Sequence, residues 1–165
     1  MRRSSLLTIW LLLVGNSVAY GQSGQIGRLH HMINEHRETV GCAPLAWHSG
    51  AAVVAQHRSA DMDRRNYFDH TTPDGRTFIH ELEDAGIDTW GSVAENIALT
   101  QAGAASAIEL WIDSRSHRRN IENCSYTHQA IGESSGFWTQ ILLAHPKKAP
   151  QGGATSDRVQ SLPEA

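Results

Sequence analysis

The residues with the clearest chemical potential in this chain are one glutamate and two histidines. Glu95 lies inside the mostly apolar run 93–98, next to Asn96. An ionised carboxylate is costly to bury alone, so Glu95 must be hydrogen-bonded, be protonated or line a wet cavity. We expect His70 and His117 to face it. They could form a chemical site with Glu95, or simply tie structural elements together by hydrogen bonds.

Two neutral imidazoles from His70 and His117 could hold a divalent ion such as Zn²⁺, with water and Glu95 completing a weak site. His57 and Asp61 are spaced i, i+4, which is more typical of a salt bridge than of a metal clamp. The other histidines show no known ligand spacing. The sequence therefore assigns no certain cofactor, and at most a weakly bound zinc or other divalent ion.

The motifs of common hydrolases are missing from this sequence. It contains neither a Gly-x-Ser-x-Gly elbow nor a His-Glu-x-x-His helix. No catalytic residue is assigned on this basis, and enzymatic activity is less expected than binding.

Helical periodicity predicts the elements that would position these residues. We expect helices over about 25–40, after a Ser49 cap, after a Thr77 cap, and over about 102–113, with Trp111 filling the core. On the second helix Arg58 is assigned to the polar face, and the acids after Thr77, including Glu81, to a solvated face. The aromatic residues of 66–70 should anchor that loop in the core.

Few strands are expected, and they lie late in the chain. The candidates are 90–93, 129–132 and 137–143, with a hairpin turn at 134–136 and a buried edge at 45–47. Helices with late antiparallel strands indicate the α+β class.

The two termini differ from the central part of the sequence. Residues 1–19 are typical of a secretory signal peptide, with cleavage after Ala19 or Gly21, and their apolar run is too short for a membrane span. Residues 146–165 lack periodicity and are predicted to be a disordered tail. We therefore expect a secreted or periplasmic protein without a transmembrane anchor.

The charge balance argues against a nucleic-acid partner. The chain has 14 basic and 17 acidic residues, and removal of residues 1–19 would take away two of the arginines. The one dense basic run, Arg115, Arg118 and Arg119, is short.

Cys42 and Cys124 are the two cysteines of a chain predicted to fold outside the cytoplasm. A disulfide is the simplest interpretation there. The alternative is two free, buried thiols.

Several of these segments together resemble the CAP superfamily, which comprises the cysteine-rich secretory, antigen-5 and pathogenesis-related proteins. The resemblance is to the compact bacterial SCP-like form and predicts one domain over 25–145. It implies a three-layer α-β-α sandwich with a small antiparallel sheet between helices. The segments that carry it, in order, are 34–37, 45–47, 60–62, 67–75, 94–98, 111–121 and 137–140.

The resemblance also implies a cavity lined by two histidines and two glutamates, of which this chain keeps half. His70 matches the first histidine and Glu95 the first glutamate. The second glutamate falls on Ser114, and the second histidine falls near Phe137. His117, in a segment similar to that of bacterial members, is the candidate replacement.

Two functions compete on this evidence. The first is a secreted, non-enzymatic module that binds a lipid, glycan or protein at the cell envelope through a polar cavity. The alternative is a metal-assisted hydrolase or peptidase that uses Glu95 with His70 and His117. Buffering of metal by histidines is a third idea, but the sequence shows no histidine clustering.

Overall fold

The computed structural model describes residues 10–145, with side-chain surroundings from residue 24 onward. The predicted tail 146–165 and the first nine residues of the predicted signal peptide lie outside these residues. In chain order the elements are α1 (Trp10–Thr39), β1 (Ala46–Trp47), α2 (Ser49–Arg65), α3 (Phe78–Asp84), β2 (Ser92–Leu99), α4 (Ala104–Asp113), α5 (Arg115–Ile121), β3 (His128–Ser134) and β4 (Phe137–Ala144).

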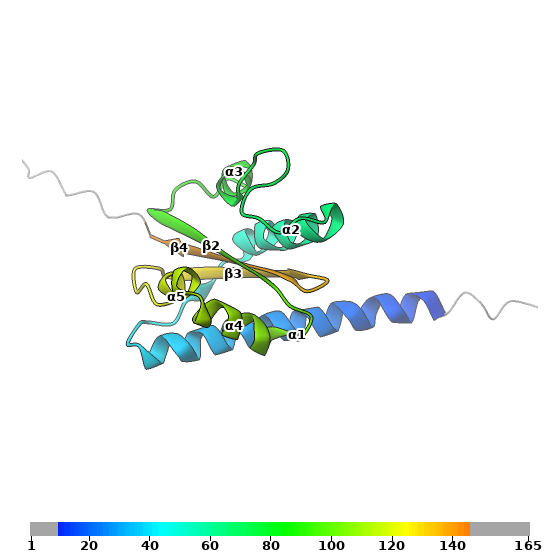
Figure 1. Ribbon diagram of the computed structural model, residues 1–165, viewed down its shortest axis with the longest axis horizontal. Coiled ribbons are helices and arrows are strands. Elements are labelled where there is room, and N and C mark those ends of the chain that lie inside the picture. Colours follow the sequence, from blue (N-terminus) through cyan, green and yellow to red (C-terminus); the bar gives the residue numbers. More distant parts are fainter. Residues whose placement is uncertain (1–9, 146–165) are drawn as a thin grey trace, which may run out of the picture.

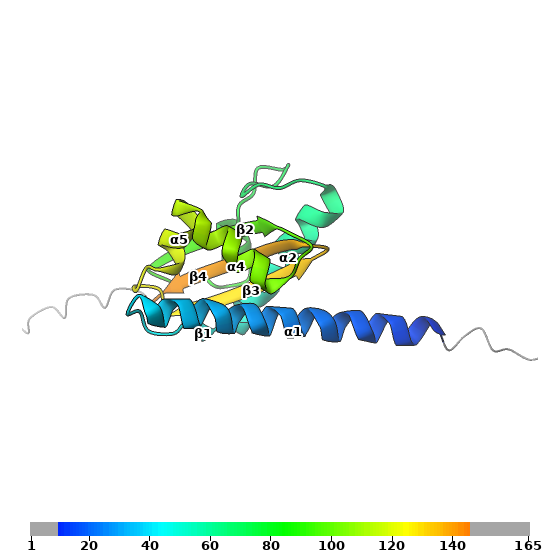
Figure 2. The same ribbon diagram turned by 60° about the horizontal axis from the view of Figure 1, so that its bottom comes forward.

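A four-stranded sheet lies between two layers of helices (Figure 1). Helices α2 and α3 cover one face, while α1, α4 and α5 cover the other (Figure 2). The predicted α+β class and three-layer arrangement are confirmed. Among the described residues, no helix combines the length and apolarity that a membrane span requires.

The sheet order is β1-β3-β4-β2, which makes β2 an edge strand. Strands β2 and β3 both run antiparallel to β4, as expected. The short strand β1 pairs in parallel with β3, so the sheet is mixed rather than purely antiparallel. Two residues of pairing between distant segments leave no periodic signal in the sequence.

The strand predicted at 90–93 is displaced and longer than expected, because β2 spans Ser92–Leu99 and contains Glu95. Four consecutive residues, 95–98, are buried. Helices cover both faces of the sheet, so the alternation of apolar and polar residues that marks a half-exposed strand is missing here.

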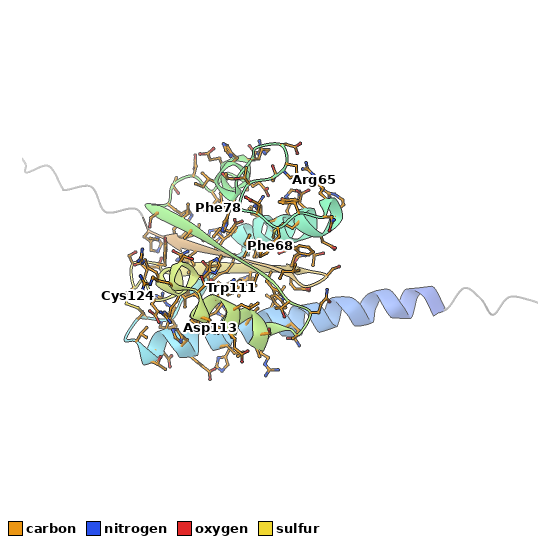
Figure 3. The ribbon with its side chains drawn as sticks, in the orientation of Figure 1. Arg65, Phe68, Phe78, Trp111, Asp113 and Cys124 are labelled. Atoms are coloured by element: carbon orange, nitrogen blue, oxygen red, sulfur yellow. A yellow bond between two sulfur atoms is a disulfide. The ribbon has the colours of Figure 1, made fainter. Side chains whose placement is uncertain are left out.

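Two apolar clusters hold the layers together. One lies between the sheet and α1 and α4, where Trp111 is fully buried as predicted (Figure 3). The other lies under α2. The edge at 45–47 is only partly buried, because Trp47 is 41% exposed. The cap of α2 is His48 rather than Ser49, since its Nδ1 accepts from the Ala51 amide at 2.9 Å.

The end of α1 is tied to the segment that follows α5. Cys42 and Cys124 form the expected disulfide, so the free-thiol alternative is wrong. Arg37 is fully buried and donates to the carbonyl oxygens of Ile121 and Asn123, at 2.6 and 3.1 Å. These contacts fix the C-terminal end of α5.

Helix α2 packs so closely on β3 that a side chain at Gly132 would disturb the contact. An added Cβ at Gly132 would lie 2.3 Å from backbone atoms of Ala55 and Gln56. Gly132→Ala should therefore lower the free energy of unfolding by about 1–3 kcal/mol or more, measured by urea denaturation. Gly27→Ala is the control, because open space surrounds Gly27 on the exposed side of α1. Equal unfolding midpoints for the two variants would contradict this packing.

Candidate functional site

Glu95 is buried on β2, as the sequence predicted, and only 6% of the residue is exposed. Its side chain faces α2, and both carboxylate oxygens are engaged. Oε1 accepts from Arg58 Nε at 3.0 Å, and Oε2 lies 2.7 Å from His70 Nδ1. Glu95 therefore bonds a cation on α2 and an imidazole on the loop after it.

Arg58 is the residue that sequence reasoning missed. It was assigned to the polar face of α2, but its side chain is fully buried. Besides Glu95, it donates to the carbonyl oxygens of Asp69 and His70, at 3.2 and 3.0 Å. It also lies 3.5 Å from Glu81, whose side chain is only 11% exposed and so does not belong to a solvated face. A buried carboxylate needs a countercharge, so the predicted burial of Glu95 could have indicated that a nearby arginine such as Arg58 points inward.

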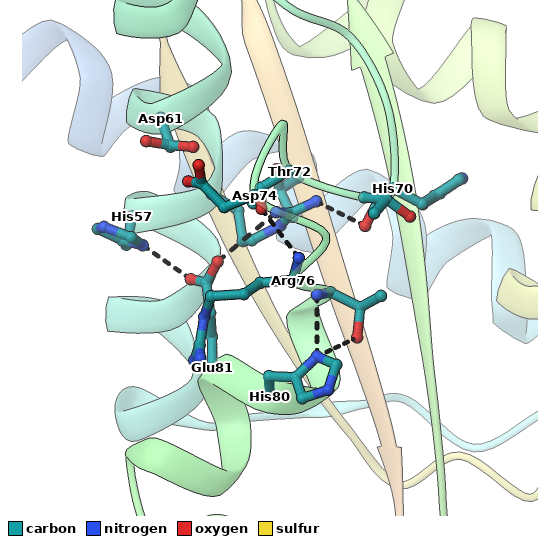
Figure 4. A network of polar contacts seen from close by, with 12 residues as sticks. His57, Asp61, His70, Thr72, Asp74, Arg76, His80 and Glu81 are labelled. Carbon is teal, nitrogen blue, oxygen red and sulfur yellow. Dashed lines mark hydrogen bonds and ion pairs between the residues drawn. The ribbon is translucent and has the colours of Figure 1, made fainter.

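Polar contacts hold the loop that carries His70. Figure 4 shows Glu81 on α3 meeting His57 on α2, where Nδ1 lies 2.7 Å from Oε2. His57 therefore pairs with Glu81 and not with Asp61, which accepts from Tyr67 Oη at 2.9 Å. Phe68, expected in the core, is 47% exposed. The loop is thus anchored by polar contacts rather than by burial of its aromatic residues.

His70 is held by Glu95 but remains open to solvent. Its Nδ1 is engaged and half of its side chain, 51%, is exposed, so Nε2 is the nitrogen left for a ligand. The hydrogen bond that His70 makes to the Glu95 carboxylate raises the pKa of His70 above its ordinary value, against the opposing effect of burial. His70 is therefore the more easily protonated imidazole of the site.

His117 lies on α5, on the other side of edge strand β2. Asn96, the neighbour of Glu95, faces this side and donates to the main-chain oxygen of His117 at 3.2 Å. Burial lowers the pKa of His117, and the charge of nearby His70 lowers it further. Both histidines thus reach the same edge, but of the two only His70 hydrogen-bonds Glu95.

A row of amide side chains crosses the sheet beside this site, and sequence reasoning missed it. Asn120 on α5 donates to Asn96, and Asn96 donates to Gln140, at 2.8 and 2.9 Å. Gln140 then donates to Gln129 at 2.8 Å, and Gln129 lies 3.0 Å from His30 on α1. The sequence feature that could have indicated this row is the presence of Asn and Gln at otherwise apolar strand positions. The row locks the orientation of Asn96 and hence the position of α5.

Ser114 and Phe137 occupy the two places where the cavity was expected to be incomplete. Ser114 joins α4 to α5, and its hydroxyl lies 3.1 Å from that of Ser116. Phe137 lies near Phe68, with ring centroids 6.4 Å apart and the ring planes tilted by 52°. An aromatic pair therefore stands where a second imidazole was expected.

The donor set does not fit a resident metal ion. Zinc sites in proteins use three or four protein ligands. Among the described residues, no group of three or more His, Cys, Asp or Glu side chains is placed to hold a metal. The carboxylate nearest to His70 is already neutralised by Arg58.

Three histidines do gather elsewhere, contrary to the expected lack of clustering. His48, His128 and His145 surround Trp90, with ring centroids at 5.3, 4.9 and 5.0 Å from the indole. Burial lowers the pKa of His128, and the charges of the other two lower it further.

Glu95→Gln tests the buried ion pair. The change leaves the buried Arg58 guanidinium without the Glu95 carboxylate, so the free energy of unfolding should fall by about 3 kcal/mol. This value is at the lower end for a broken buried ion pair, because Glu81 and two carbonyl oxygens still contact Arg58. Asp84→Asn is the control, since it breaks the exposed pair with Arg76 and should change stability little. Equal losses in chemical denaturation would show that burial of the Arg58–Glu95 pair is not the cause.

The two imidazoles should respond oppositely to pH. His70 has a raised folded pKa, so its stabilising contribution is complete below its unfolded value of about 6.5 and fades as pH rises through the folded value. His117 has a lowered pKa, so its contribution is complete above about 6.5 and is lost as pH falls. NMR titration should place the two midpoints on opposite sides of that value, and Glu95→Gln should lower that of His70. A shared midpoint would contradict the geometry.

Comparison with known proteins places the chain in a family. A profile described as the cysteine-rich secretory protein family, CAP, matches residues 30–139. The uncharacterized protein YkwD of Bacillus subtilis (strain 168) is 33% identical over 114 residues, which cover 68% of this chain and 44% of that protein. The uncharacterized membrane protein YlbC of the same strain is 33% identical over 112 residues, which cover 68% and 32%. The chain thus spans less than half the length of these curated relatives.

Solved structures agree with this assignment. An extracellular protein containing a SCP domain from Bacillus anthracis str. Ames superposes with a TM-score of 0.72 at 28% identity, over 74% of this chain and 41% of that one. An outer surface protein of Borrelia burgdorferi gives 0.65 at 16% identity, over 75% and 94%, which shows the fold alone. Because the family profile matches more than half of its residues, this chain belongs to the cysteine-rich secretory protein (CAP) family.

Proposed function

We propose that this chain is an exported binding module that holds a polar ligand at the edge of β2, between His70 and His117. The observation that carries the proposal is the state of Glu95. Both of its oxygens are engaged, one by Arg58 and one by His70. A carboxylate held in this way orients an imidazole and is poorly placed to abstract a proton.

The two imidazoles give the ligand complementary partners. The raised pKa of His70 favours its protonated form, in which Nε2 carries a hydrogen that can be donated. The lowered pKa of His117 favours its neutral form, which can accept a hydrogen bond. A hydroxyl, amide or carboxylate group can use such a pair. Phe68, two residues before His70 in the same loop, also exposes an apolar ring. Glycan, lipid and peptide ligands all carry these groups.

Export is supported by several independent features. The sequence begins with a region typical of a signal peptide. The disulfide between Cys42 and Cys124 suits an oxidising compartment. The structural relative from Bacillus anthracis is described as extracellular.

A hydrolase is the second candidate, and one observation favours it. Two neighbouring imidazoles with opposite pKa shifts are the arrangement that separates a general acid from a general base. Ser114, where the family cavity would place a second carboxylate, weighs against it.

One purification distinguishes the two candidates. We expect native mass spectrometry of the exported protein to show a co-purified ligand that is lost in His70→Ala and in His117→Ala. His31→Ala is the control, because His31 is an exposed histidine on α1 whose side chain is 73% accessible. Peptide or ester hydrolysis that both site variants abolish would instead support the hydrolase. A ligand retained by both site variants would contradict the proposed site.

A further inference from the structure

The outer face of α5 carries three arginines with no acidic partner. Arg115, Arg118 and Arg119 are exposed and line a hollow of about 580 Å³ together with Glu122 and Asn123. None of the three forms an ion pair within the described part of the chain. The face is distinct from the inner side of the same helix, which carries His117 and Asn120.

Several arginines elsewhere in the described structure do form ion pairs. Arg58 pairs with Glu95, Arg65 with Asp74, and Arg76 with Asp84. The whole chain holds more acidic than basic residues, 17 against 14, so carboxylates are not scarce. Like charges three or four residues apart on a helix repel one another. The α5 cluster therefore concentrates positive charge where a bound anion would relieve the repulsion.

Most polar groups that line the hollow can donate hydrogen bonds. Asn123 uses its Oδ1 to accept from the Ser125 amide at 3.0 Å, which leaves its NH₂ group free to donate. Glu122 is the one acid, and its carboxylate already lies 3.0 Å from His36 Nε2. Arg118 donates one N–H to the carbonyl oxygen of Ile112 at 3.2 Å, and its other N–H groups are left to bind a ligand.

The platform beneath these side chains is fixed. Ile121 at the end of α5 is fully buried, and Arg37 donates to its carbonyl oxygen at 2.6 Å. The disulfide holds Cys124 just after the hollow. The backbone that presents the guanidinium groups is thus preorganised, which reduces the entropy lost when a ligand binds.

We propose that this hollow binds a phosphate-bearing anion. Guanidinium groups present paired N–H donors that match the oxygens of a phosphate, and three arginines line this hollow. The site is small, and the chain around it is acidic overall, so it suits one phosphate group rather than an extended nucleic acid. The proposal uses the face of α5 opposite His117 and does not depend on the ligand proposed for that site.

NMR of the arginine Nε–Hε groups tests it, with inorganic phosphate and pyrophosphate as soluble probes. Saturable shifts are expected at Arg115, Arg118 and Arg119. Arg119→Gln should weaken binding about tenfold, as expected for a lost hydrogen bond between charged groups. Arg119→Lys, which keeps the charge but not the paired donors, should fall between. Arg76→Gln removes one exposed charge elsewhere and should leave the affinity within about twofold.

A second arm separates a free phosphate from a lipid headgroup. Vesicles of phosphatidylcholine containing phosphatidylglycerol are compared with vesicles carrying the same charge as oleate, a carboxylate. Binding to phosphatidylglycerol vesicles that is lost in the Arg118→Gln/Arg119→Gln variant assigns the site to a headgroup, and saturation by soluble phosphate assigns it to a free phosphate. Equal binding to oleate vesicles, equal weakening by Arg76→Gln, or no binding of any probe would overturn the proposal. His70 and His117 are intact in every variant, so this outcome is independent of the function proposed above.

Discussion

The buried ion pair between Arg58 and Glu95 is the constraint on which the site depends. Removing two charges from water costs several kcal/mol per ion and is recovered only with good geometry and full hydrogen bonding. Arg58 meets that requirement by joining four elements through its guanidinium group. It sits on α2, bonds Glu95 on β2, lies near Glu81 on α3, and donates to two carbonyls of the loop that carries His70. The orientation of His70 therefore follows from the need to satisfy a buried arginine.

The position of β2 at the edge of the sheet explains how two unlike histidines meet. Neighbouring residues on a strand point to opposite faces, so Glu95 faces α2 while Asn96 faces α5. On an inner strand these two surroundings would stay separated by the sheet. At the edge, His70 approaches from one side and His117 from the other. His70 gains a carboxylate partner, so the hydrogen bond to Glu95 raises its pKa. His117 has no such partner, so burial lowers its pKa and the charge of His70 lowers it further.

Local patterns made part of this arrangement predictable from sequence. Four of the five helices in the described residues, the buried Trp111 and the partnered Glu95 follow from periodicity and from the cost of a lone charge, whereas α5 was not predicted as a helix. The inward direction of Arg58 was also encoded, because it lies three residues after Ala55 and four before Met62, both on the buried face of α2. Arg58 was nevertheless assigned to the solvent-exposed face of α2, because arginine is a charged residue type. Contacts between distant segments leave no local pattern, so they could not be predicted from the sequence. Examples are the pairing of β1 with β3 and the amide row from Asn96 to Gln129.

The two family positions that this chain lacks bear on its chemistry. The retained carboxylate, Glu95, is the one that the fold itself requires, since its loss would strand the Arg58 charge inside the protein. The position of the second carboxylate is occupied by Ser114, which is partly exposed between α4 and α5. Its hydroxyl group hydrogen-bonds the hydroxyl group of Ser116. Losing an acid there carries little structural cost. The carboxylate that holds the structure together is thus kept, while the position that the family resemblance assigns to a second carboxylate carries a serine. This difference supports the binding function proposed above more than the hydrolase alternative.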